Sequence, residues 1–186
     1  MCAPGQIPPE LNGRIDRLAV PILVDGQTLI QDSADIIRHL DTHGAPMLQS
    51  YGTSHALEEW RTSIAAPLSA LCYPRMPQLN VPELASPDAL AFFESTMPKR
   101  IGMSFDEALA QTSRFARIVE AALPGVLPFL ELRNISFDTL AALADLRSLT
   151  MVAEISFPEQ VLIHFNDLIA RAGVKPFTPV TAKEIT

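Results

Sequence analysis

The feature that most constrains the fold is a segment in which two short apolar runs flank a turn and lead directly into a helix. Residues 20–24 and 27–31 flank Asp25-Gly26, a pair that favours the positive φ angles of a type I′ hairpin turn. The second run ends at Asp32-Ser33, and apolar residues at helical spacing follow at once. One of these two residues is therefore expected to cap a helix. The predicted order is strand, tight turn, strand, helix.

The rest of the chain contains residues typical of helix starts and helix ends, which predicts a helical protein. The helix after the hairpin is expected to end at Gly44, and residues 46–52 form a linker. Later helices are predicted from apolar spacing and from capping residues. The first of these carries a buried stripe of Leu57, Trp60, Ile64, Leu68 and Leu71, and the second is opened by Pro87. One helix is predicted from the Ser104–Glu107 capping box to Leu123. A central apolar helix over 138–153 has a weak cap because Thr139 replaces an acid, and a last long helix runs from 156–159 to Gly173.

Several blocks together resemble a known family. Val20-Pro21-Ile22-Leu23 followed by Asp32-Ser33 is similar to the glutathione-binding segment that closes the thioredoxin-type domain of glutathione transferases and GST-like glutaredoxins. Leu57-Glu58-Glu59-Trp60, Tyr73-Pro74-Arg75 and residues 145–153 resemble the helical C-terminal domain of the glutaredoxin 2 type. The resemblance runs from about residue 10 to residue 174.

This resemblance implies a mostly α protein. Residues 52–186 would form a GST C-terminal-like, all-helical domain. Residues 1–45 would form a partial thioredoxin-fold segment, a β-hairpin plus a helix.

The family's catalytic motif is absent from the sequence. It resembles Cys-Pro-Tyr-Cys at the start of the first helix, whereas this chain contains no Cys-x-x-Cys. Only 19 residues precede Val20, and a strand-helix-strand unit needs roughly 30, so the first half of the thioredoxin-like domain is expected to be missing. Cys2 is expected to be a thiol on a frayed terminus, and Cys72 a small buried hydrophobe. No catalytic residue is assigned.

The resemblance also implies a glutathione site at Val20, Pro21, Asp32 and Ser33. If the Val20-Pro21 bond is cis, as the family implies, the backbone of Val20 can pair with the cysteinyl unit of glutathione. A helix start at Asp32-Ser33 offers free N–H groups to the γ-glutamyl carboxylate, and the Asp32 carboxylate can pair with the amino group. The alternative is an ordinary N-cap. Arg75 is expected either to contact a ligand carboxylate or to be a helix-terminating surface arginine.

Composition and charge exclude several kinds of binding partner and several classes of protein. A formal net charge of -7 disfavours nucleic acid and anionic membranes as partners. There is no apolar run of 18 residues and no signal-peptide pattern. Two cysteines suit a reducing cytoplasm. Asp35, His39 and His43 have the spacing of a metal pair but are expected to be a solvated helix face, so no metal is predicted.

Two functional hypotheses follow from the sequence. In the first, the chain is a glutathione-dependent thiol–disulfide oxidoreductase of the glutaredoxin 2 type, inactive as this chain, with glutathione or glutathionylated proteins as partners. The alternative is a non-catalytic, glutathione-binding or protein-interaction scaffold. The strand at 20–24 would lack a neighbour on one side, so self-association through this edge is also expected.

Overall fold

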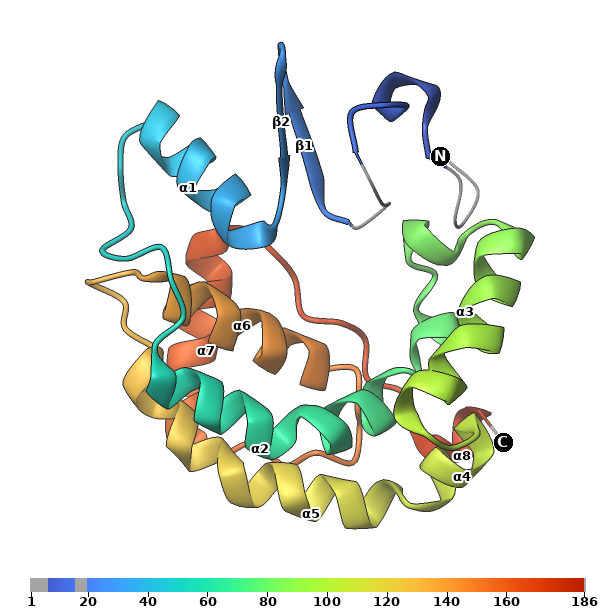
Figure 1. Cartoon of the computed structure of the whole chain (residues 1–186). Helices are drawn as coiled ribbons and strands as arrows, with labels where there is room; N and C mark the ends of the chain where they lie inside the picture. Colours follow the sequence, from blue (N-terminus) through green and yellow to red (C-terminus); the bar gives the residue numbers. More distant parts are fainter. Residues whose placement is uncertain (1–6, 16–19, 186) are drawn as a thin grey trace.

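The computed structural model describes residues 7–15 and 20–185. It is mostly helical with a small antiparallel sheet, as predicted (Figure 1). The N-terminal part holds a short 3₁₀ helix η1 (Pro9–Leu11), strands β1 (Ile22–Asp25) and β2 (Thr28–Gln31), and helix α1 (Ser33–His43). None of the helices in the described ranges is long and apolar enough to cross a membrane.

The hairpin turn lies one residue later than predicted. Asp25 pairs with Thr28, so the two turn residues are Gly26 and Gln27 rather than Asp25 and Gly26. Gly26 has a φ of 58°, and Gln27 is not among the positive-φ residues. A positive φ at the first central position alone is the pattern of a type II′ turn, which also suits a hairpin. The type I′ prediction was therefore wrong in both position and type.

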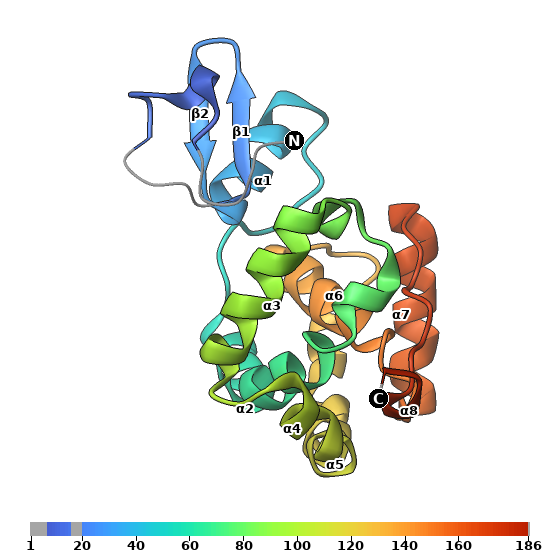
Figure 2. The ribbon, with the colours of Figure 1, turned by 90° about the vertical axis from the view of Figure 1, so that its right-hand side faces the viewer.

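The two faces of the hairpin have different neighbours. Helix α1 covers one face, where His39 Nε2 donates to the Asp25 carboxylate at 2.9 Å. The segment that contains η1 lies on the other face (Figures 1 and 2). There Leu11 is buried, and Arg14 Nη2 donates to the carbonyl of Gln27 at 3.1 Å.

The larger part of the chain is a set of helices around one apolar core. Their bounds are α2 (His55–Cys72), η2 (Met76–Leu79), η3 (Pro82–Leu84), α3 (Pro87–Ile101), α4 (Phe105–Ala110), α5 (Thr112–Ala122), η4 (Leu123–Phe129), α6 (Phe137–Leu149), α7 (Glu159–Ala172) and α8 (Ala182–Ile185). Helix α2 packs against α5 and α6. Its predicted stripe is confirmed except at Leu68, which is only partly buried: Leu57, Trp60, Ile64 and Leu71 are all buried.

Two predicted helix boundaries were wrong, whereas the start of α7 falls within the predicted segment 156–159. The helix that begins at the Ser104 capping box breaks at Gln111, so α4 and α5 are separate helices. Helix α6 ends at Leu149 rather than near 153. Helix α7 has Pro158 at its N-cap, while the backbone N–H of Ser156 donates to Glu120 at 2.7 Å.

Residues 47–54 tie the hairpin part to the helical core. The carboxylate of Asp41, near the end of α1, accepts hydrogen bonds from the backbone N–H groups of Met47 and Leu48 and from the Tyr51 hydroxyl. A few residues later the N–H of Ser54 donates to Asp138 in the first turn of α6, at 2.8 Å. The linker is therefore held at both ends by carboxylates.

Candidate functional site

The pairing register of the hairpin brings the predicted glutathione-binding residues together. Ile22 pairs with Gln31, so the next step along the register sets Pro21 opposite Asp32. Val20-Pro21 and Asp32-Ser33 therefore lie at the same end of the hairpin, where β2 passes into α1. The Val20-Pro21 peptide bond is cis, and the side chain of Val20 is 81% exposed.

Asp32 is the N-cap of α1, which confirms the predicted helix start. Its Oδ1 accepts hydrogen bonds from the N–H groups of Ala34 at 2.8 Å and Asp35 at 3.4 Å. Its φ of 142° and ψ of 133° lie outside the left-handed region that aspartate adopts with ease, so the backbone is strained at this residue. The second oxygen, Oδ2, makes no hydrogen bond within the described part of the chain. The carboxylate therefore caps the helix and still offers one oxygen to a ligand.

Ser33 opens α1 and is exposed. Its hydroxyl makes no hydrogen bond to residues 7–15 or 20–185. The first N–H groups of a helix have no partner within the helix and carry the positive end of its dipole. The N–H groups of Ala34 and Asp35 already donate to the Asp32 carboxylate. Within the described residues, the Ser33 N–H and hydroxyl are therefore the donors left at this helix start for a ligand carboxylate.

Helix α1 is held in place by its histidines. The imidazole of His39 is 15% exposed and bonded to Asp25. The centroids of the His39 and His43 rings lie 4.0 Å apart, and His43 Nδ1 donates to the carbonyl of His39 at 2.7 Å. The prediction of a solvated Asp35–His39–His43 face was therefore wrong at His39, whose ring packs on the hairpin. No group of three or more metal-ligating side chains occurs among the residues described.

Cys72 is buried at the end of α2, as predicted. Burial raises the pKa of its thiol to about 12, with the positive charge of Arg75 acting in the opposite direction. Its Sγ donates to the carbonyl of Ser148 at 3.5 Å. The thiolate is the reactive form of cysteine, so Cys72 is not a nucleophile at neutral pH. Cys2 lies outside the described residues.

Both predictions for Arg75 were wrong, because the side chain is fully buried. Its guanidinium donates to the carbonyls of Leu71 and Val180, to the Thr112 hydroxyl and to the Glu154 carboxylate. Glu154 also accepts from the N–H of Ala182. Arg75 therefore links α2, α5 and the C-terminal segment, and it is not available to a ligand.

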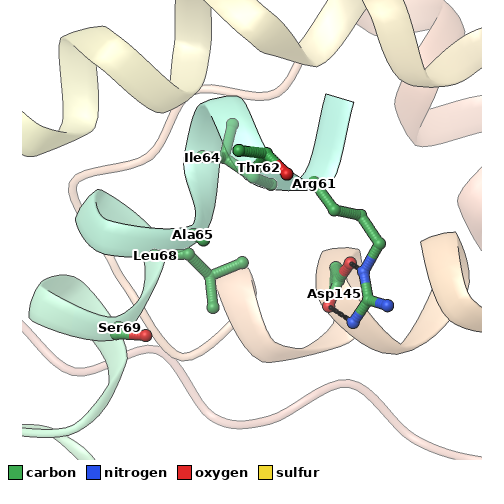
Figure 3. Close-up of a pocket in the computed structure, with 7 residues that line it drawn as sticks. All are labelled: Arg61, Thr62, Ile64, Ala65, Leu68, Ser69 and Asp145. Atoms are coloured by element: carbon green, nitrogen blue, oxygen red, sulfur yellow. Dashed lines mark hydrogen bonds and ion pairs between the residues drawn. The ribbon is translucent and has the colours of Figure 1, made fainter. Parts of the chain in front are cut away.

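A second charged pair was missed by the sequence reasoning. Arg61 on α2 and Asp145 on α6 form an ion pair at the edge of a hollow of about 270 Å³ between the two helices (Figure 3). The signal that could have revealed it is a single acidic residue, Asp145, near the end of the otherwise apolar stretch 140–146.

The comparison with known families decides the family. The profile described as "Glutaredoxin 2, C terminal domain" matches residues 56–180, which is more than half of the chain. The chain belongs to the glutaredoxin 2 C-terminal domain family.

Individual relatives agree with this assignment. The glutaredoxin 2 proteins of Escherichia coli strain K12 and of E. coli O157:H7 are each 26% identical over 161 residues, which cover 83% of this chain and 74% of the relative. The crystal structure of glutaredoxin 2 from Salmonella typhimurium in complex with glutathione aligns with a TM-score of 0.75 and 24% identity, over 92% of this chain and 81% of that chain. This structural match shows that the glutaredoxin 2 fold is shared.

Proposed function

We propose that this glutaredoxin 2 family member binds glutathione through Val20, Pro21, Asp32 and Ser33, and that its 186 residues alone do not catalyse glutathione-dependent thiol–disulfide exchange. The observation that carries the proposal is the hairpin register, because it sets the exposed Val20-Pro21 segment beside Asp32 and Ser33 at the start of α1. A related glutaredoxin 2 has been solved in complex with glutathione, which supports the choice of ligand.

Each part of this site suits one part of glutathione. The exposed Val20 would offer its main-chain groups to the cysteinyl unit. The Ser33 hydroxyl and the Ser33 N–H would bind the γ-glutamyl carboxylate, since the next N–H groups of α1 donate to Asp32 Oδ1. The free oxygen of Asp32 would bind the γ-glutamyl ammonium group. Affinity is expected to be weak, since four residues at one end of a hairpin bury little of the ligand.

The proposed lack of catalysis rests on the thiols. Exchange begins when a thiolate attacks a disulfide sulfur. The sequence has no Cys-x-x-Cys, and the buried Cys72 keeps its proton at neutral pH. Bound glutathione or glutathionylated proteins would therefore be held but not turned over, and a reducing cytoplasm is the compartment that suits such partners.

Calorimetric titration with glutathione tests the site. Asp32→Asn keeps a good N-cap side chain but removes the charge, so it is expected to weaken binding by about tenfold, the value of one charged hydrogen bond. Ser33→Ala is expected to weaken binding by a smaller factor. Ser113→Ala, at an exposed serine on α5, is the matched control and should leave the affinity unchanged. Equal affinities in all four proteins would place the site elsewhere.

A coupled assay with glutathione and a mixed-disulfide substrate tests the second part. The wild-type chain is expected to show turnover at background level. Activity well above background that disappears in Cys2→Ser would contradict the proposal, because it would assign the chemistry to the terminal thiol.

A further inference from the structure

The hollow between α2 and α6 is built around a charged pair that is open on one side. Arg61 Nε donates to Asp145 Oδ2 at 2.7 Å, and Nη2 reaches Oδ1 only at 3.4 Å (Figure 3). The Arg61 side chain is 45% exposed and that of Asp145 is 16% exposed. Nη1 makes no hydrogen bond to any described residue. The guanidinium and the carboxylate therefore each keep bonding capacity toward the hollow.

The other walls of the hollow are of two kinds. Ile64, Ala65 and Leu68 supply an apolar side, and Thr62 and Ser69 supply hydroxyl groups. Neither hydroxyl has a hydrogen-bond partner within residues 7–15 and 20–185. At about 270 Å³ the hollow is slightly smaller than the range for sites of drug-sized ligands, roughly 300–1,000 Å³. A ligand the size of an amino acid fits, and a nucleotide does not.

The charges select among small ligands. A simple anion would approach Arg61 but meet the Asp145 carboxylate, and a simple cation would meet Arg61. A group that carries both charges can bond to each side at once. From this geometry we infer that the hollow binds a free α-amino-acid group, with its carboxylate on Arg61 Nη1, its ammonium on Asp145 Oδ1 and an aliphatic side chain against Ala65 and Leu68.

The burial of the Asp145 carboxyl group agrees with this inference. Burial raises the pKa of its carboxyl group, while the hydrogen bond from Arg61 opposes the rise. Arg61 alone therefore does not fully compensate for the water that the carboxylate has lost. A ligand ammonium group would add the missing charged hydrogen bond.

This inference is independent of the proposed glutathione site, because it uses residues of α2 and α6 only. Free amino acids and the γ-glutamyl end of glutathione share the recognised chemistry. The two sources are separated by titrating the protein with L-leucine and with glutathione, while the amides of residues 61–66, 68, 69 and 145 are followed by ¹⁵N NMR.

L-Leucine is expected to shift these amides in a saturable manner. N-Acetyl-leucine, which lacks the cation, and leucine methyl ester, which lacks the anion, are each expected to bind at least about tenfold more weakly. Glutathione would count as a source if it shifts the same amides in the Asp32→Asn protein. If glutathione leaves them unshifted there, free amino acids are the source.

Two variants distinguish a ligand site from an ion pair that only joins helices. The exchange Arg61→Asp with Asp145→Arg keeps an ion pair but reverses its polarity. A ligand turned around to match it would direct its side chain away from Ala65 and Leu68, so leucine binding is expected to weaken by at least about tenfold, and binding equal to that of the wild type would overturn the inference. Arg38→Leu, which breaks the exposed Arg38–Asp35 pair, should bind leucine as the wild type does. The inference is overturned if leucine fails to saturate the wild type, or if the three leucine compounds bind equally. The double variant Arg61→Leu with Asp145→Leu replaces both charges by apolar side chains, and it serves as the test if the exchange variant does not fold. Leucine binding equal to that of the wild type in this double variant would overturn the inference.

Discussion

At the scale of single residues, Arg75 shows why a charged side chain is the hardest feature to place from sequence. Its position after an apolar helix and beside Pro74 predicted exposure. Its partners Thr112, Glu154 and Val180 lie 37, 79 and 105 residues away. No local pattern encodes such distant contacts, and a buried arginine depends on all of them because each unpaired donor would cost free energy.

Removal of this side chain is expected to destabilise the protein strongly. Arg75→Met should lower the free energy of unfolding by about 3–5 kcal/mol, because it leaves the Glu154 carboxylate and two carbonyls without their donor. Arg38→Met, at an exposed pair, should cost less than about 1 kcal/mol. Urea unfolding measures both. Equal losses in the two variants would contradict the buried network, and Glu154→Gln offers a milder test if Arg75→Met does not fold.

At the scale of elements, sequence predicted which segments are helical better than where they end. The start of α3 at Pro87 and the Ser104 capping box are as predicted, because each depends on residues within one turn. The break at Gln111 has no such local signal. The cap of α6 shows the opposite case: Thr139 was expected to weaken it, yet its hydroxyl accepts from the N–H of Ser136 and completes a capping box.

The joint between α1 and the linker gives a pH-dependent prediction. The N–H of Met47 and then the Tyr51 hydroxyl hold the pKa of Asp41 below its ordinary value of 3.8. A lowered folded-state pKa means that the stabilisation by Asp41 is fully present above pH 3.8 and is lost as the pH falls through the folded-state pKa. An NMR titration of the Asp41 carboxyl carbon should therefore show a midpoint below 3.8. In Tyr51→Phe the midpoint should move upward, since one donor is gone, and an unmoved midpoint would show that the hydroxyl does not act on Asp41.

At the scale of the whole molecule, the sequence predicted the fold class and the family, and it brought the proposed site residues onto one hairpin. Those predictions rest on local order, which survives a shift of the turn by one residue. The division into parts at 1–45 and 52–186, and the role of Val20, Pro21, Asp32 and Ser33, stay predictions. The hollow between α2 and α6 could not be predicted, because it depends on how two helices pack whose paired residues, Arg61 and Asp145, lie 84 residues apart in the sequence.

The division into two parts can be tested through local stability. Within the described residues β1 pairs only with β2, and neither strand nor α1 contains a buried side chain. Helix α6, in contrast, buries Thr139, Ala142, Leu143, Leu146 and Leu149. A hairpin without further strands is only marginally stable, so the N-terminal part is expected to open without unfolding the helical core.

Native-state hydrogen exchange should therefore separate the two parts of the chain. The paired amides of Leu23 and Ile30 are expected to exchange much faster than those of Leu143 and Leu146. Because hydrogen-bonded and non-hydrogen-bonded pairs alternate along an antiparallel ladder, the N–H groups of Ile22 and Val24 point toward the open edge of β1. If two chains pair through this edge, these amides should become protected as the protein concentration rises. Equal protection of the hairpin and α6 in a strictly monomeric sample would show that both parts unfold as one unit and that the edge needs no partner.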